Sequence, residues 1–297
     1  MKVFADLHIH SHHSSDGEWT VPQIFAEARQ AGLEVFSISD HDTVAALEEA
    51  FILAGDFPGE YLANVEVSVR HQGMGFHLLA PLVDWHDPPL LDLLARIRLS
   101  RVRQNEARVG LLRDLGFDIR YEEVREALGP VAGTGPAIAS VVLSKGSNRN
   151  HALVRQIPSG SKLSPEIDFY KYFFLPGGPA FAAKETVSLP QAIETVRAAG
   201  GVPVLAHPGQ KSGVVDERWI RSAKEMGLEG VEAYSSYHTG ETCRYYEEIA
   251  RRLDLVVTSG SDFHGRVKPQ VAFGDVPRSP AELVDRLKER RERVVHG

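Results

Sequence analysis

The first residues of the chain include a pair of side chains suited to metal binding. His8 and His10 stand two positions apart at the end of a short apolar run. The two-residue period of a β-strand points both imidazoles to the same side, where they can chelate one ion. Histidines and carboxylates then recur at or near the ends of other short apolar runs: Asp40, His41, Glu66, His77, His207, Asp262 and His264.

This recurrence predicts a metal centre. Crowded imidazoles and carboxylates remain uncompensated unless a cation lies between them. In a parallel barrel, the carboxyl ends of the strands meet at one mouth, and Asp16 of the loop after the first strand joins them there. All of these ligands offer nitrogen or oxygen, which suits Mn²⁺, Fe²⁺ or Zn²⁺ and argues against Cu(I) or an iron–sulfur cluster.

The elements that position these residues alternate in type. Short strands are expected at 3–7, 34–39, 61–65, 76–80, 202–205, 230–233 and 255–258. Stretches such as 21–31 and 44–53 lie between them and have the periodicity of amphipathic helices. This alternation is typical of a parallel α/β fold. A closed barrel suits the convergence of the ligands better than an open sheet does.

The interval between the fourth and fifth expected strands has a different pattern. A long helix is expected at 90–115, and a polar, loop-rich stretch follows at 144–168. We interpret residues 87–182 as a mostly helical cap with a lid, inserted into a barrel formed by residues 1–86 and 183–297. The alternative is an insertion with a structural role only.

Composition and charge exclude several classes of protein. The chain of 297 residues has 33 Lys and Arg against 40 Asp and Glu, a net charge of −7, which disfavours general nucleic-acid binding but allows a small phosphorylated substrate. A single cysteine, Cys243, excludes an intrachain disulfide and a thiolate metal cluster. No apolar run is long enough to span a membrane and no signal peptide is recognisable, so we expect a cytoplasmic protein.

Four motifs together resemble one known family. They are DLHIHSHHSSDG at 6–17, SISDHDT at 37–43, AHPG at 206–209 and SGSDFH at 259–264. The NVEVS segment at 64–68 and His77 lie between them in the same order as in that family. The chain resembles the PHP (polymerase and histidinol phosphatase) superfamily of metal-dependent phosphoesterases. It is most similar to stand-alone members with a helical insertion, which include a nucleoside 3′,5′-bisphosphate phosphatase.

The resemblance implies a distorted (β/α)₇ barrel with two or three divalent ions, in the fullest case a trinuclear centre. It assigns the ligands to three ions. The first set is His8, His10, Glu66 and Asp262, the second is Glu66, His77 and His207, and the third is Asp16, His41 and His264. Asp16 stands where some relatives have histidine, so the third ion is expected to be the most weakly held. Asp6 and Asp40 are expected to accept hydrogen bonds that orient imidazole N–H groups.

The implied reaction is phosphate ester hydrolysis by a hydroxide from a water molecule of lowered pKa. Asp262 belongs to the catalytic group, and His238 and Arg266 are the best candidates for contacting the phosphate or protonating the leaving oxygen. Further substrate-binding candidates are Arg70, Lys211, Arg149 and Arg155.

The insertion departs from the bisphosphate-processing relatives. They carry the pattern Arg-Pro-His-(apolar)-Ala-Arg, whereas this chain has TGPAIAS at 134–140. Gln210 follows AHPG, where those relatives tend to have arginine. Charged contacts to a second phosphate would therefore be lost at these positions.

Several functions remain open from the sequence. A small phosphomonoester, such as a nucleotide or a sugar phosphate, is the favoured substrate because a cap would close over a compact ligand. A cyclic or linear phosphodiester is the first alternative. An amidohydrolase-type C–N hydrolase would usually need a bridging lysine, and the third and fourth expected strands contain none. A non-catalytic, metal-stabilised module is disfavoured by the intact set of ligands. The sequence does not indicate an oligomeric state.

Overall fold

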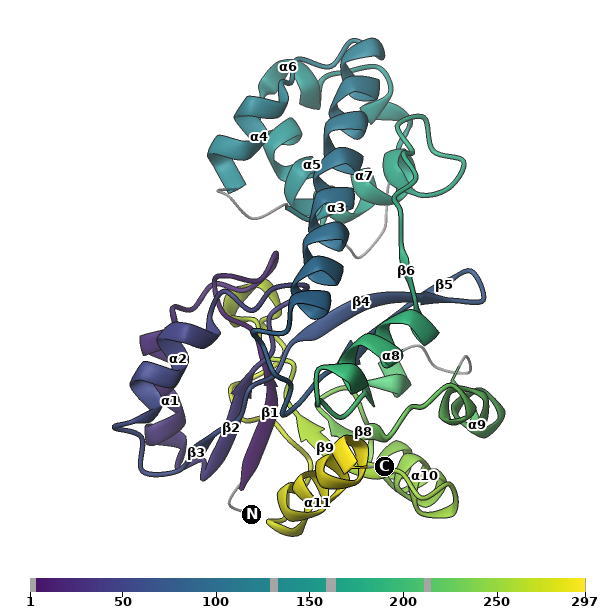
Figure 1. Cartoon of the computed structure of the whole chain (residues 1–297). Coiled ribbons are helices and arrows are strands. Elements are labelled where there is room, and N and C mark those ends of the chain that lie inside the picture. The colour runs from purple at the N-terminus through teal and green to yellow at the C-terminus, as the bar shows by residue number, and fades with distance from the viewer. Residues whose placement is uncertain (1–3, 129–132, 159–163, 211–214, 297) are drawn as a thin grey trace. The chain divides into compact units, whose positions relative to one another are not determined.

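The computed structural model describes residues 4–128, 133–158, 164–210 and 215–296, and it divides the chain into two compact units. The first unit comprises Met1–Ala95 and Thr186–Gly297, and the second comprises Arg96–Glu185. The boundary between them falls within a long helix, α3 (Pro88–Asp114; Figure 1). None of the helices in the described ranges has the length and apolar character needed to cross a membrane.

Two β-sheets form the centre of the first unit. β1 (Ala5–Ile9), β2 (Val35–Ile38) and β3 (Glu60–Tyr61) form a parallel sheet in that order. The second sheet has the order β6-β4-β5-β7-β8-β9. Its strands are β4 (Glu66–His71), β5 (Met74–Leu79), β6 (Val187–Ser188), β7 (Val204–Leu205), β8 (Gly230–Ser235) and β9 (Val256–Gly260).

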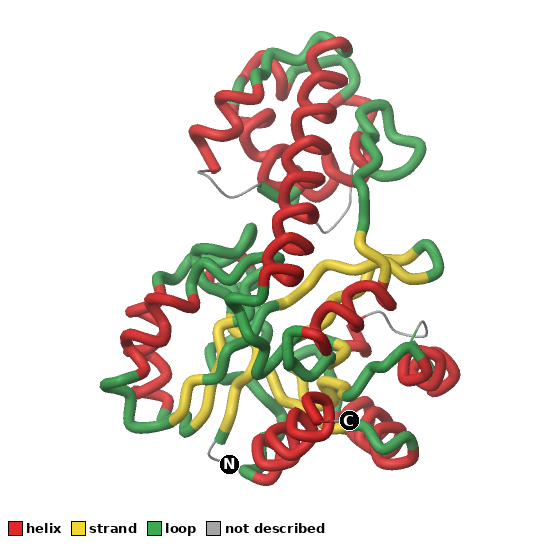
Figure 2. The backbone as a smooth tube through the Cα atoms, in the orientation of Figure 1, coloured by secondary structure: helices red, strands yellow, loops and turns green. Residues whose placement is uncertain are grey.

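Helices pack on these sheets and confirm a mixed α/β fold (Figures 1 and 2). They are α1 (Val21–Ala31), α2 (Leu47–Ala54), α8 (Leu189–Ala198), α9 (Glu217–Glu225), α10 (Gly240–Arg252) and α11 (Glu282–His296). α1 shows how local sequence defines such a helix. Thr20 and Gln23 form a capping box at its start, and Gly32, with φ 68°, ends it in the left-handed conformation. Its buried face places Ile24 and Phe25 in one core with Phe36 of β2.

The two sheets meet at two isolated parallel bridges. Ile9, at the end of β1, pairs with Phe263 just beyond β9, and His41, beyond β2, pairs with Glu66 of β4. A common hydrophobic core also includes residues of both sheets, among them Leu7 of β1 and Leu79 of β5. The bridges therefore place chain segments that carry predicted ligands next to one another.

One strand runs against the predicted direction. The sequence pattern predicts parallel strands throughout, but β5 is antiparallel to both β4 and β7. The reason is the connection between β4 and β5, which consists of Gln72 and Gly73 with φ 49° and 81°. Such a two-residue turn with positive φ forms a hairpin, whereas a parallel neighbour requires a long crossover.

The described residues of the second unit form helices and loops. Besides most of α3, they include α4 (Tyr121–Leu128), α5 (Gly135–Ser144), α6 (Gly146–Arg149) and α7 (Pro165–Phe174). An aromatic core holds them together, in which Phe117 contacts Phe169 and Phe173 edge to face. This unit therefore has a hydrophobic core of its own.

Candidate metal centre

Strands of the first unit bring the predicted ligands together. Most of the ligands lie at or just beyond the carboxyl end of a strand, but Glu66 begins β4 and His77 lies inside β5. The expectation that Glu66 ends a strand is therefore wrong. Three groups have ligand atoms within 4.8 Å of one another. They are His8, His10, Glu66 and Asp262; then His10, Asp16, His41 and His264; and finally His41, Glu66 and His77.

The first group is fully buried and compact. The Nε2 atoms of His8 and His10 lie 3.1 Å apart, and each lies 3.2 Å from Asp262 Oδ1. Glu66 Oε2 is 3.3 Å from His8 Nε2 and 3.2 Å from His10 Nε2. Four ligand atoms around a tetrahedral ion with bonds of about 2.1 Å would be about 3.4 Å apart. The spacing of these four atoms thus fits one ion.

Glu66 divides its two oxygens between neighbouring groups. Oε2 faces the first group, while Oε1 lies 3.0 Å from His77 Nδ1 and 3.1 Å from His207 Nε2. His41 also approaches, with its Nδ1 atom 2.9 Å from Oε2. A carboxylate in this arrangement can bridge two cations. His41 thereby lies between two groups, whereas the sequence motifs assign it to the third ion alone.

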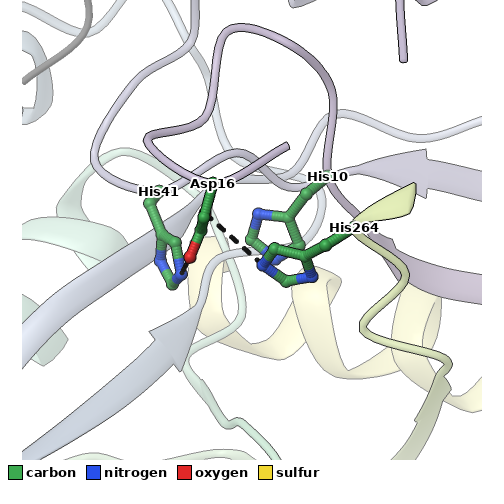
Figure 3. Close-up of side chains that lie close together, drawn as sticks. All are labelled: His10, Asp16, His41 and His264. Atoms are coloured by element: carbon green, nitrogen blue, oxygen red, sulfur yellow. Dashed lines mark ion pairs between the residues drawn. The ribbon is translucent and has the colours of Figure 1, made fainter. Parts of the chain in front are cut away.

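The third group surrounds Asp16, as Figure 3 shows. Asp16 Oδ1 lies 3.4 Å from His264 Nε2, and Asp16 Oδ2 lies 3.7 Å from His41 Nε2. His10 joins them, because its ring packs on His264 with 3.8 Å between the centroids. The motifs place His10 in the first group only, so its membership here is an addition from the structure.

Unpartnered buried atoms show that these residues fit a cluster of cations. In the described part of the chain, some buried side-chain atoms have no hydrogen-bond partner. Five of them belong to the three groups: His41 Nδ1, Glu66 Oε2, His77 Nδ1, Asp262 Oδ1 and His264 Nε2. Each such atom costs roughly 1–3 kcal/mol of desolvation. Divalent cations bound by the groups would satisfy all five at once.

The charges in the cluster are strongly coupled. Burial opposes ionisation of Glu66, but His41, His77 and His8 outweigh it and hold the pKa of this carboxyl well below its usual range. Burial lowers the pKa of His10 to about 4, so this imidazole is neutral near pH 7, as a metal ligand must be. Burial alone would lower the pKa of His8, but the carboxylates of Glu232, Glu66 and Asp262 raise it well above its usual value. The carboxylates of the site therefore favour positive charge among the imidazoles, which a bound cation would supply.

Glu232 is a functional candidate that sequence reasoning missed. It is fully buried in β8, where its Oε1 accepts a hydrogen bond from His8 Nδ1 at 2.9 Å. Its Oε2 accepts from the backbone N–H of His207 at 2.7 Å. Because a carboxylate oxygen accepts, His8 Nδ1 carries a proton, and Nε2, which faces the first group, is the nitrogen left to bind a cation. The sequence signal was a lone acidic residue in an otherwise apolar strand.

Asp262 is held by two further side chains. Tyr237 Oη and Lys268 Nζ each donate to Asp262 Oδ2 at 2.6 Å, which leaves Oδ1 facing His8 and His10. Burial and the charge of Asp262 raise the pKa of Tyr237, so its hydroxyl stays protonated at neutral pH. Lys268 thereby places a cation beside the first group.

Asp6 and Asp40 have a different role from the predicted one. Asp6 Oδ1 accepts from the backbone N–H groups of Ser261 and His8, at 2.9 Å and 3.2 Å. Asp40 accepts from the N–H and the hydroxyl of Ser11, both at 2.6 Å. They thus fix the backbone beside the ligands rather than imidazole N–H groups. Burial raises the pKa of each carboxyl to about 6.

His238 and Arg266, the favoured candidates for contacting substrate, are engaged otherwise. His238 uses both ring nitrogens for the backbone: Nδ1 donates to Ala233 O and Nε2 accepts from Gly209 N–H, each at 2.9 Å. In this geometry it positions the loop after β7 and offers no free nitrogen for acid–base work. The Arg266 side chain is 91% exposed and pairs with Glu18 at 3.2 Å, so the structure does not organise it toward the ligands.

The remaining candidates are scattered. Arg70 donates to the carbonyl of Gly73 in the β4–β5 turn, at 2.9 Å and 3.1 Å, and is exposed. Arg149 and Arg155 are exposed residues of the second unit. Lys211 lies outside the described residues. The structure thus places none of the described members of this set among the predicted ligands.

Comparisons with known proteins agree with this site. A family model described as PHP domain matches residues 6–87. A phosphoribosyl 1,2-cyclic phosphate 1,2-diphosphodiesterase of Eggerthella lenta is 30% identical over 277 residues, which cover 93% of this chain and 97% of the relative. A 3′,5′-nucleoside bisphosphate phosphatase of Chromobacterium violaceum is 29% identical over 261 residues (87% and 86%). A 5′-3′ exoribonuclease of Haemophilus influenzae is 29% identical over 264 residues (87% and 89%).

The fold is also found among solved structures. One from Bifidobacterium adolescentis has a TM-score of 0.77 and covers 98% of this chain and 97% of its own, at 24% identity. An α/β frame that gathers buried imidazoles and carboxylates in this way defines a metal-dependent hydrolase. The chain belongs to the PHP family of metal-dependent phosphoesterases, as its motifs predict.

Proposed function

We propose that this chain hydrolyses a small phosphomonoester, such as a nucleotide or a sugar phosphate. The main support is the buried cluster in which the two oxygens of Glu66 serve different groups of ligands. When bound in such a cluster, divalent cations lower the pKa of water and take up charge from the phosphoryl oxygens. We propose two or three ions, of Mn, Fe or Zn, held by the nine residues predicted from the motifs, with His10 shared between two of the positions.

Two protein groups would complete the site. Lys268 would contact the substrate phosphate, because its Nζ lies beside Asp262 and its side chain is 23% exposed. Tyr237 would keep the orientation of Asp262 through its hydroxyl when Lys268 moves to the phosphate, since both donate to the same oxygen. Asp262 itself would act through Oδ1, which faces the imidazoles of His8 and His10.

We further propose that the first unit closes into the distorted seven-stranded barrel of the family. The paired neighbours β4, β5, β7, β8 and β9 would be joined to β1 and β2 through the bridges at Ile9 and His41. That ring contains seven strands, with β3 and β6 beside it. The Arg96–Glu185 unit would then be the cap inserted into the barrel sequence.

A phosphodiester is the second candidate substrate. It is favoured by the similarity to the Eggerthella lenta relative, whose name describes a cyclic phosphate diesterase and whose length the match covers almost completely. The Haemophilus influenzae relative, named as an exoribonuclease, adds an oligoribonucleotide to the possibilities. The net charge of −7 disfavours general nucleic-acid binding but not the end of a short strand.

Substrate profiling of the metal-loaded protein tests the proposal. The panel comprises an aryl phosphate, a bis(aryl) phosphate, a nucleoside 3′,5′-bisphosphate, a ribose cyclic phosphate and a 5′-phosphorylated oligoribonucleotide. We expect the highest kcat/KM for a monoester, with no turnover by Glu66→Ala. Preference for the bis(aryl) or cyclic phosphate would establish the diesterase alternative. Absence of turnover with every substrate would contradict the assignment as a phosphoesterase.

A further inference from the structure

The hydroxyl of Ser14 contacts three of the four residues drawn in Figure 3. Ser14 lies in the loop between β1 and α1 and is 3% exposed. Its Oγ atom donates to Asp16 Oδ1 at 3.0 Å and accepts from the backbone N–H of His41 at 3.2 Å. The Nδ1 atom of His10 lies 3.1 Å from the same oxygen. One buried hydroxyl thus connects most of the third group.

These hydrogen bonds determine which nitrogen of His10 carries a proton. A serine hydroxyl has one hydrogen to donate and two lone pairs that accept. Because a carboxylate oxygen accepts, the hydrogen of Ser14 points to Asp16, and the N–H of His41 occupies one lone pair. The contact with His10 therefore requires a hydrogen on Nδ1 of that ring, which donates to the second lone pair. Nε2 is then the nitrogen of His10 that is left to bind a cation.

The backbone of the loop holds Ser14 in place. Its N–H donates to the carbonyl of Ser11 at 3.0 Å. Ser11 in turn donates its N–H and its hydroxyl to the buried carboxylate of Asp40, both at 2.6 Å. Gly17 lies so close to this turn that an added Cβ would be 2.0 Å from the carbonyl oxygen of Ser11. All of these contacts join groups of the protein, so the position of the Ser14 hydroxyl needs no bound ion.

We propose that Ser14 is a positioning residue of the third group, which presents Asp16 to the ion and keeps His10 in the form that binds one. Asp16 needs this support because it lies on a loop and its side chain is 19% exposed. Partners that hydrogen-bond to metal ligands typically change metal affinity by about 10–100-fold. The inference rests on the ions of the proposed function and adds a residue that is not itself a ligand.

Competition between a chelator and the metal-loaded protein tests the role of Ser14 without a substrate. Ser14→Ala removes the hydroxyl. Ser37→Ala is the matched control, because Ser37 of β2 is fully buried and its Oγ has no hydrogen-bond partner in the described part of the chain. We expect Ser14→Ala to bind the most weakly held ion about tenfold less tightly or worse, and Ser37→Ala to bind it as the wild type does. Equal affinity in Ser14→Ala and the wild type overturns the proposal.

A double variant separates positioning from a general loss of stability. Asp16→Ala removes the ligand that Ser14 presents, so adding Ser14→Ala should leave the number of ions found by elemental analysis at that of Asp16→Ala alone. Loss of a further ion from the double variant would show that Ser14 supports the whole cluster through the fold, and overturns the proposal. A wild type that binds no third ion overturns it together with the third position. Absence of turnover with every phosphate ester would refute the proposed reaction alone, since neither measurement needs a substrate.

Discussion

Replacing Glu232 by glutamine tests whether this buried carboxylate positions the metal ligands His8 and His207 or only stabilises the fold. The two carboxylate oxygens accept from His8 Nδ1 at 2.9 Å and from His207 N–H at 2.7 Å. Glutamine offers one acceptor and one NH₂ donor in nearly the same volume, so it can satisfy only one of the two contacts. If its oxygen accepts from His207, the NH₂ group faces His8 Nδ1 and favours the tautomer with the proton on Nε2, the atom that faces Glu66 and Asp262.

Either orientation of the glutamine is costly. With the oxygen toward His8, the buried N–H of His207 has no acceptor, at a cost of roughly 1–3 kcal/mol. With the oxygen toward His207, His8 must change tautomer before it can bind a cation. Loss of a carboxylate behind a metal-bound histidine typically lowers metal affinity by about 10–100-fold, which is about 1.4–2.8 kcal/mol. We expect Glu232→Gln to fall in this range.

Competition with a chromogenic chelator measures the affinity, and thermal unfolding of the metal-free protein measures stability. Glu229→Gln is the matched control, because Glu229 immediately precedes β8 and pairs with Arg197 and Arg290 instead of with the ligands. It should lower Tm and leave metal affinity unchanged. Excess metal should restore kcat of Glu232→Gln without changing KM. A Glu232→Gln protein that binds metal as tightly as the wild type would refute the positioning role.

Four other outcomes are expected. Glu66→Ala should lose at least two ions by elemental analysis and nearly all turnover, since both oxygens face separate ligand groups. Asp16→Ala should lose one ion, and this should be the ion that a chelator removes first from the wild type, because Asp16 lies on a loop and is 19% exposed. Unchanged metal content would contradict the assignment of Asp16 as a ligand. Lys268→Met should lower kcat/KM about 100-fold with metal content unchanged, and parallel loss of metal would mean that Lys268 acts only through Asp262. Dialysis against a chelator should abolish activity, and titration with Mn²⁺, Fe²⁺ or Zn²⁺ should identify the ion that restores it at the lowest concentration.

Much of the site could be predicted because its residues lie in short, local motifs. The spacing of His8 and His10 requires only the period of a strand, and Asp262 and His264 follow a strand in the same way. The structure brings all of these together in the groups described above. The antiparallel direction of β5 was also readable in principle, since a two-residue Gln-Gly connection cannot contain a crossover helix.

Other features depend on contacts between distant segments. Glu232 is far from His8 in sequence, and only the pairing of β8 with its neighbours places its carboxylate beside that imidazole. The role of His238 likewise depends on Gly209, whose N–H it accepts. A lone histidine in a loop gives no indication of such a backbone contact. Sequence could therefore identify the ligands more readily than the residues that hold them.

The backbone at two of the ligands indicates that the protein, rather than the ion, determines their positions. His207 and Asp262 have positive φ angles, 27° and 59°, which cost roughly 1–3 kcal/mol each for residues other than glycine. Hydrogen bonds hold both: His207 N–H donates to Glu232, and Asp262 N–H donates to the carbonyl of His8 at 2.8 Å. Both hydrogen bonds join two groups of the protein, so neither needs a bound ion. The folded first unit thus bears the strain, and cations bound there would meet ligand atoms that the fold has already placed.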